Sequence, residues 1–163
     1  MAKSTKIFLG VFVVFVIIFL YVHQFFVFVV VDGHSMEPTF KNRSVLWFNR
    51  VNDKLELGDV VCFSLENHMY IKRITGAPGD YYLINDTSKL HPYDEINESY
   101  MLFDPKVMKN HPMSSSLVPS LKVKVIPKGY YFVEGDNIKT SEDSKIFGLI
   151  SQNQVLGEQI GGM

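Results

Sequence analysis

Residues 69–75, MYIKRIT, decide how we expect this chain to fold, because they enclose a single lysine, Lys72, in a run of β-favouring residues. Alternate side chains of a strand share one face. Lys72 therefore lies on the same face as Tyr70 and Ile74, whereas Arg73 points to the opposite face. The pattern predicts a strand that directs Lys72 into an apolar neighbourhood and leaves Arg73 to meet solvent or a carboxylate. The alternative is an amphipathic strand on which Lys72 is exposed to solvent.

Similar short runs continue on both sides of this strand, separated by the Gly, Pro, Asn and Asp residues that favour turns. No stretch between residues 32 and 163 shows a sustained helical period. We therefore predict a mainly β, antiparallel fold for this part of the chain. The expected strands occupy residues 44–48, 60–64, 69–75, 121–126 and 130–134, with a hairpin tip at Asn67 and His68.

Residues 81–125 are polar and irregular, and we expect them to form a small inserted β subdomain with long loops. The two histidines of this insertion, His91 and His111, are not grouped with carboxylates at the spacing of a metal site. The sequence therefore predicts neither a metal nor a cofactor. The chain has a net charge of -1 and so lacks the excess of basic residues that is typical of nucleic-acid-binding proteins.

The amino-terminal segment is intensely apolar, because residues 7–22 contain no charged side chain and residues 25–31 are apolar again. A helix needs about 20 residues to cross the hydrocarbon core of a bilayer. We expect a transmembrane anchor over residues 7–25, with the stems of Lys3 and Lys6 extending to the membrane surface. The density of aromatic and β-branched residues after Gln24 predicts that the helix gives way to a strand.

The positive charges precede this anchor, so the positive-inside rule predicts a cytoplasmic amino terminus at residues 1–6 and an extracytoplasmic β domain at residues 26–163. One alternative is a single tilted helix that continues to Val31. Another is a cleavable secretory signal that ends at residues 33–35. Such signals have a shorter apolar region, of about 7 to 15 residues. This chain also lacks an Ala-x-Ala site, since its alanines are Ala2 and Ala77.

The segment at residues 33–40, GHSMEPTF, places Ser35 directly after the apolar region. A lone loop serine is usually a turn former. A serine and a desolvated lysine, however, can act as nucleophile and base. Cys62 is a weaker candidate nucleophile, because it lies in an apolar run that predicts a buried strand. Ser35 and Lys72 are therefore the candidate catalytic residues.

Four stretches together resemble type I signal peptidase, the membrane-anchored serine-lysine endopeptidase that removes signal peptides from exported proteins. They are residues 35–39 (SMEPT), 57–63 (LGDVVCF), 70–80 (YIKRITGAPGD), and 135–137 (GDN) with 141–148 (SEDSKIFG). Their order and the preceding anchor match too, and the short layout resembles the Gram-positive members. The resemblance implies a catalytic β domain of the signal peptidase type, attached to the bacterial cell membrane, that acts on preproteins.

The resemblance also implies roles for individual residues. Ser35 would be the nucleophile and a neutral Lys72 the general base, in a reaction that passes through an acyl-enzyme. Met36 would lie near the substrate pocket. The residues implied to orient the lysine or support the site are Ser141, Asp143, Lys145 and Arg73.

The chain departs from the family pattern at two positions. Lys145 stands where the family usually has arginine, so an ion pair with Asp143 lacks the bidentate guanidinium fork. Gly33 stands where some members have a serine that helps bind the oxyanion. In this chain the oxyanion site would depend on the backbone of the Gly33 region and above all on the Ser35 N–H.

Two rival functions remain open from the sequence. One is a self-cleaving serine-lysine protease of the SOS-repressor type, against which the anchor and the motif at residues 135–148 argue. The other is a catalytically weak or inactive membrane-anchored paralogue that binds signal peptides or partner proteins. The sequence leaves the oligomeric state and the identity of the preproteins open.

Overall fold

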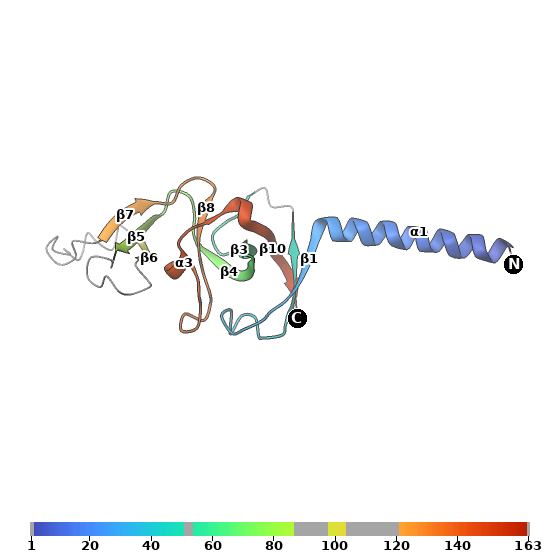
Figure 1. Ribbon diagram of the computed structural model, residues 1–163, viewed down its shortest axis with the longest axis horizontal. Coiled ribbons are helices and arrows are strands. Elements are labelled where there is room, and N and C mark those ends of the chain that lie inside the picture. The colour runs from blue at the N-terminus through green and yellow to red at the C-terminus, as the bar shows by residue number, and fades with distance from the viewer. Residues whose placement is uncertain (1, 51–53, 87–97, 104–120, 163) are drawn as a thin grey trace.

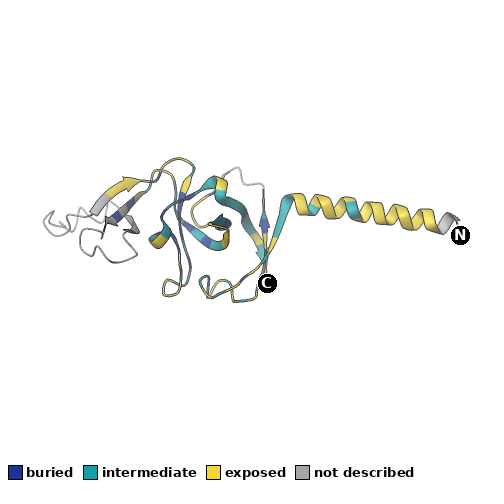
Figure 2. Ribbon diagram, viewed as in Figure 1, coloured by how far each residue is buried: buried dark blue, intermediate teal, exposed yellow. Residues whose placement is uncertain are grey.

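The computed structural model describes residues 2–50, 54–86, 98–103 and 121–162. A long helix, α1 (Ala2–Phe25), extends away from a β domain, as Figure 1 shows. The span Thr5–Phe25 has a mean hydropathy of 2.6 and is 0% buried, so it is long and apolar enough to cross a membrane. Figure 2 shows that the residues of this helix are exposed almost throughout.

Strand β1 (Phe26–Val30) begins at the residue that follows α1. The aromatic and β-branched residues of this segment favour an extended chain over a helix. The prediction that the helix gives way to a strand near Gln24 is therefore confirmed. The alternative of one helix through Val31 is wrong, because β1 pairs with β2 (Val45–Asn49) over its whole length.

The main sheet has seven strands in the order β1-β2-β10-β3-β4-β8-β9, and its described pairings are antiparallel. The mainly β, antiparallel fold predicted for this part is thus confirmed. Its remaining strands are β3 (Val60–Leu65), β4 (His68–Gly76), β8 (Tyr130–Glu134), β9 (Ile150–Ser151) and β10 (Val155–Gly162).

The β3–β4 hairpin carries Lys72, which lies opposite Val61 in the register. Its tip consists of Glu66 and Asn67, both with positive φ, whereas His68 already belongs to β4. The predicted tip at Asn67 and His68 is therefore wrong by one residue. Side-chain patterns place a turn less accurately than they place a strand, because they do not specify backbone dihedral angles.

The two faces of the main sheet are covered by separate apolar clusters. One contains Val61, Phe63 and Ile74, and the other contains Phe48 and Cys62, all at most 1% exposed. Burial raises the pKa of the Cys62 thiol to about 12. Cys62 thus serves as a small apolar group of the core, as the sequence indicates.

A second sheet of three strands lies between β4 and β8 in the chain, in the order β6-β5-β7. It comprises β5 (Tyr81–Asp86), β6 (Glu98–Phe103) and β7 (Leu121–Val125), and it matches the predicted inserted β subdomain. The two histidines considered as metal ligands, His91 and His111, lie outside the described residues.

The structure adds short helical turns that the sequence pattern did not predict. Helix α3 (Ser144–Phe147) begins after Asp143, whose side chain accepts a hydrogen bond from the Lys145 N–H as an N-cap. The 3₁₀ turn η2 (Gln152–Gln154) follows β9. Elements of this length have no measurable hydrophobic period, so periodicity cannot detect them.

Candidate active site

The loop after β1 places Ser35 in one cavity with Lys72 of β4. Met36, the next residue, is 1% exposed and fixes the loop to the core. The Ser35 carbonyl accepts a hydrogen bond of 2.9 Å from the Asn137 N–H, and the His34 carbonyl accepts one of 3.1 Å from Asn137 Nδ2. The backbone of the Ser35 loop is therefore held by the turn that follows β8.

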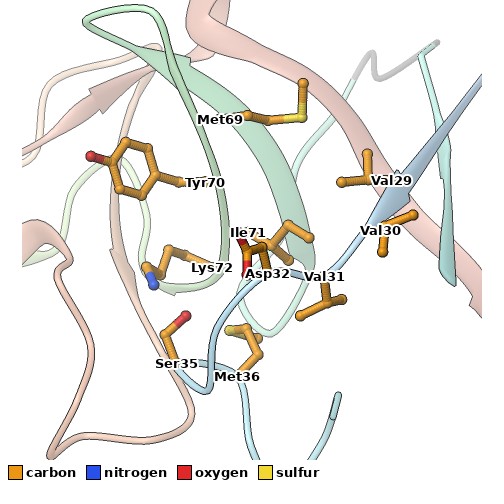
Figure 3. A pocket seen from close by; sticks show the side chains of 10 residues that line it. All are labelled: Val29, Val30, Val31, Asp32, Ser35, Met36, Met69, Tyr70, Ile71 and Lys72. Atoms are coloured by element: carbon orange, nitrogen blue, oxygen red, sulfur yellow. The ribbon is translucent and has the colours of Figure 1, made fainter. Parts of the chain in front are cut away.

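Lys72 lies in the middle of β4 and is 3% exposed. Burial lowers the pKa of its ammonium, the carboxylates of Asp143 and Glu142 oppose that effect, and the charge of Lys145 adds to it. Figure 3 shows the Lys72 amine and the Ser35 hydroxyl pointing toward one another. Lys72 is thus buried, and the alternative of an exposed Lys72 on an amphipathic strand is wrong.

Two hollows meet at this pair of side chains. A cavity of about 240 Å³ is bounded by β1, the Ser35 loop and β4, and its lining is mainly apolar (Figure 3). Its lining residues are Val29, Val30, Val31, Asp32, Ser35, Met36, Met69, Tyr70, Ile71 and Lys72. A second hollow of about 260 Å³ also contains Ser35 and Lys72 and extends to Thr140 and Glu142. Both hollows thus reach Ser35 and Lys72.

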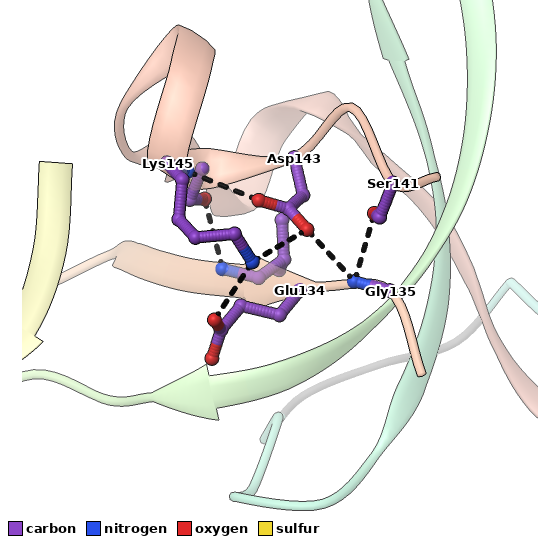
Figure 4. Close-up of polar contacts among 7 residues, drawn as sticks. Glu134, Gly135, Ser141, Asp143 and Lys145 are labelled. Atoms are coloured by element: carbon purple, nitrogen blue, oxygen red, sulfur yellow. Dashed lines mark hydrogen bonds and ion pairs between the residues drawn. The ribbon is translucent and has the colours of Figure 1, made fainter. Parts of the chain in front are cut away.

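Gly135 packs directly behind the Ser35 loop. Its N–H donates to Ser141 Oγ and to Asp143 Oδ2, each at 3.1 Å (Figure 4). A Cβ atom at position 135 would lie 2.5 Å from the Ser35 carbonyl oxygen and 2.7 Å from the Ser141 Cβ. Since real Cβ atoms do not approach other atoms this closely, the site requires glycine here for its lack of a side chain.

Asp143 connects this glycine to Lys145. The Asp143 side chain is 0% exposed and lies 2.9 Å from Lys145 Nζ, which also lies 3.0 Å from Glu134 Oε1 (Figure 4). Burial would raise the pKa of the Asp143 carboxyl, but hydrogen bonds from Ser141, Lys145 and the backbone hold it below its ordinary value. Burial alone would lower the pKa of Lys145, and the hydrogen bonds to Asp143 and Glu134 raise it instead.

Arg73 forms a second ion pair on the opposite face of β4 from Lys72. Its Nε donates to Asp136 Oδ1 at 2.9 Å and its Nη2 to Asp136 Oδ2 at 2.7 Å. Thr39 also donates to Asp136. The hydrogen bonds from Arg73 are the main cause that lowers the pKa of Asp136. Arg73 thus finds the carboxylate that the strand pattern allowed for, and it ties the turn after β8 to β4.

The structure brings most of the predicted residues together. Ser35, Met36 and Lys72 line one cavity. Ser141, Asp143 and Lys145 form one polar cluster around Gly135. The Gly33 N–H donates to Asn42 Oδ1 at 3.2 Å, so this group is directed toward Asn42.

Sequence reasoning missed the support that comes from the end of β8. Glu134, Asp136 and Asn137 each contact the site or its ion pairs. The sequence shows them only as a strand end and a turn. One signal was available, because a Gly-Asp-Asn turn was among the stretches that resemble the family. Their partners, however, depend on the register of β4 with β8, which the residue pattern does not specify.

Among the residues that the structure describes, His, Cys, Asp and Glu side chains form no group of three or more that could hold a metal ion. The site itself brings together the Ser35 hydroxyl and the amine of Lys72, which is 3% exposed. This combination is typical of nucleophilic catalysis by a serine with a lysine base.

Comparison with known proteins identifies the family of this chain. The family model described as signal peptidase, peptidase S26, matches residues 4–161. The chain therefore belongs to the signal peptidase family, whose members are serine peptidases that cleave signal peptides and are membrane-associated in bacteria.

Individual relatives fall in the same class. The chain is 36% identical over 143 residues to signal peptidase IB of Staphylococcus aureus, a match that covers 78% of this chain and 72% of that one. It is 32% identical over 132 residues to signal peptidase I of Bacillus amyloliquefaciens, covering 78% and 70%. A crystal structure of signal peptidase I from Enterococcus faecalis aligns with a TM-score of 0.39 at 21% identity, over 65% of this chain and 97% of that one.

Proposed function

We propose that this chain is a membrane-anchored endopeptidase that cuts signal peptides from exported preproteins with Ser35 as nucleophile and Lys72 as general base. The observation that carries the proposal is that the Ser35 hydroxyl and the amine of Lys72, which is 3% exposed, point toward one another in one cavity (Figure 3). An ordinary lysine has a pKa of about 10.4 and is protonated near neutrality. Burial favours the neutral amine that the reaction needs.

The first half of the reaction forms an acyl-enzyme. Neutral Lys72 takes the proton of the Ser35 hydroxyl while its Oγ attacks the scissile carbonyl carbon. The Ser35 N–H belongs to the same residue as the attacking Oγ, so it is the backbone donor proposed for the developing oxyanion. The Gly33 N–H already donates to Asn42 Oδ1. Lys72 then gives its proton to the departing amine, which becomes the new amino terminus of the exported protein.

The second half reverses these roles. Lys72, neutral again, removes a proton from water, and the resulting hydroxide attacks the acyl carbon of Ser35. The ester bond breaks, the carboxylate of the signal peptide leaves, and Ser35 recovers its proton from Lys72. Ser141 and Asp143 support this exchange from the other side of Gly135, because the Gly135 N–H binds both of their side chains.

The mainly apolar cavity beside Ser35 is the proposed site for the residues that precede the cut. Met36 and Ile71 contribute to its walls, and the strand β1 lies along it. Seven of its ten lining residues are apolar, which suits apolar side chains better than charged ones.

Helix α1 is the proposed anchor, with the amino terminus in the cytoplasm and the β domain outside. Retention of the helix is supported by the strand that follows it. A cut at residues 33–35 would remove β1 from the sheet together with Val31, which is 5% exposed. A removable signal would not be expected to form part of the folded core.

The test is incubation of the purified full chain in detergent with a preprotein, followed by sequencing of the amino terminus of the product. We expect one cut at the end of the signal peptide, and no cut by Ser35→Ala or Lys72→Ala. An intact preprotein after incubation with the wild type would favour an inactive, binding paralogue. A cut within this chain itself would favour the self-cleaving type.

A further inference from the structure

Lys145 is held by two carboxylates at once. Its Nζ lies 2.9 Å from Asp143 Oδ2 and 3.0 Å from Glu134 Oε1. A lysine ammonium is a point charge without the planar fork of arginine, so a contact with one carboxylate leaves its direction free. The second carboxylate supplies the missing constraint. The Glu134–Lys145 contact thus bears directly on how firmly Asp143 is held.

Glu134 is also joined covalently to the group that Asp143 holds. It is the last residue of β8, and its peptide bond contains the Gly135 nitrogen, whose N–H donates to Ser141 and Asp143. Anchoring the Glu134 side chain therefore restricts rotation of the peptide plane that carries this N–H. This peptide also packs closely against the Ser35 loop, since a Cβ at position 135 would lie 2.5 Å from the Ser35 carbonyl oxygen.

Glu134 forms its ion pair with Lys145, although a second cation, Arg73, also lies close to it. Arg73 stands opposite Glu134 in the β4–β8 register. The Nε and Nη2 atoms of Arg73, however, donate hydrogen bonds to the Asp136 carboxylate. Gly135 is thereby flanked in the sequence by two anchored carboxylates, Glu134 on Lys145 and Asp136 on Arg73.

We propose that Glu134 is a positioning residue of the active site, which holds Lys145 on Asp143 and thereby fixes the Gly135 peptide behind Ser35. Its effect on turnover rests on the proposed function. The competing interpretation is an ordinary ion pair at the surface, and such pairs usually contribute little. Asp143 distinguishes the positioning role from an ordinary surface ion pair. Its side chain is 0% exposed, and a buried carboxylate depends on its partners.

The experiment compares Glu134→Gln, Lys145→Arg and the double variant E134Q/K145R in the full chain in detergent. Glutamine keeps the size of the side chain but loses its charge, so the fold is retained. A guanidinium at position 145 can bind Asp143 through two nitrogens and so takes over the constraint that Glu134 supplies. Glu56→Gln is the matched control, because Glu56 forms an exposed pair with Lys54 at 2.9 Å.

We expect Glu134→Gln to lower kcat on a preprotein peptide about tenfold with little change in KM, because Glu134 is absent from the lining of both hollows. The double variant should recover to within about twofold of Lys145→Arg alone. Glu56→Gln should match the wild type.

A second readout does not depend on turnover. The amide signal of Gly135 in a heteronuclear NMR spectrum should shift in Glu134→Gln and return in E134Q/K145R. Wild-type kcat in Glu134→Gln, or equal losses in Glu134→Gln and the double variant, would overturn the inference. An inactive wild type would overturn the proposed function, and the Gly135 signal would then decide whether Glu134 acts through Lys145.

Discussion

Lys72 and Lys145 carry the same ammonium group and both interact with Asp143, yet their surroundings shift their pKa values in opposite directions. Lys72 is 3% exposed within an apolar strand environment, whereas the Lys145 side chain is 31% exposed and touches two carboxylates. The difference teaches that burial prepares an amine for proton transfer only where carboxylates stay out of direct contact with it. The predictions below test this contrast.

The largest expected difference is in turnover. Lys72→Met should lower preprotein cleavage by more than about a thousandfold, because it removes the base, whereas Lys145→Met should lower it about tenfold. Initial rates of both purified variants measure this. Comparable losses would show that both lysines serve the reaction in the same way.

The close packing of Gly135 against the Ser35 loop gives the next largest effect. Gly135→Ala should lower kcat about a hundredfold, because the new methyl group displaces the Ser35 backbone or Ser141. Gly161→Ala is a suitable control, since a Cβ at position 161 would meet no atom within 4 Å. Full activity of Gly135→Ala would mean that the backbone relaxes without moving Ser35.

A smaller effect is expected in the pH dependence. In the proposed mechanism the active form has neutral Lys72, so the rate should rise with pH through the lowered pKa of Lys72 and then level off. Glu142→Gln removes a charge that raises this pKa and should move the rise to lower pH. Lys145→Met removes a charge that lowers the pKa and should move the rise to higher pH.

On the rising limb of the profile these shifts should change the rate by about two- to threefold in opposite directions. Rate profiles from neutral to alkaline pH measure them. Shifts of the same sign would contradict the assignment of the titration to Lys72. The groups that line the hollows around Lys72, Asp32 and His34 among them, should be kept unchanged in this series.

The smallest effect is expected in thermal stability, where Lys72→Met and Lys145→Met should change Tm in opposite directions. Because the folded pKa of Lys72 is lowered, burial of its ammonium costs stability below that pKa, and the cost disappears as the pH rises to the ordinary lysine value. Lys72→Met should therefore raise Tm by about 4 °C, which corresponds to about 1 kcal/mol.

Lys145 should behave in the opposite way. Its folded pKa is raised, so its stabilising effect is complete below the ordinary lysine pKa and is lost as the pH rises through the folded value. Lys145→Met should lower Tm by a few degrees, about 1 kcal/mol or less for a partly exposed group. Thermal unfolding near neutral pH compares the two variants, and equal signs would contradict the contrast.

The sequence predicted the strand that carries Lys72, the helix before Ser35 and the inserted sheet, because each has a local pattern or turn signal. It also led to Ser35 and Lys72 as candidates, because a hydroxyl directly after the apolar segment and a lysine within a strand pattern are visible in the residue order, and the structure places both at one cavity. It did not lead to Glu134 or Asp136. Their partners, Lys145 and Arg73, are set by the strand register and by a short helical turn, neither of which leaves a periodic trace.

The direct passage from α1 into β1 has a consequence for the choice of the bond that is cut. With no residues between Phe25 and Phe26 to act as a flexible tether, the sheet and Ser35 are carried at a set distance from the end of the helix. Under the proposed anchoring, the height of Ser35 above the lipid surface is a constant of the fold. Under the proposed function, a preprotein would be cut where its extended chain reaches that height. The membrane would then take part in selecting the peptide bond, together with the cavity proposed to bind the side chains.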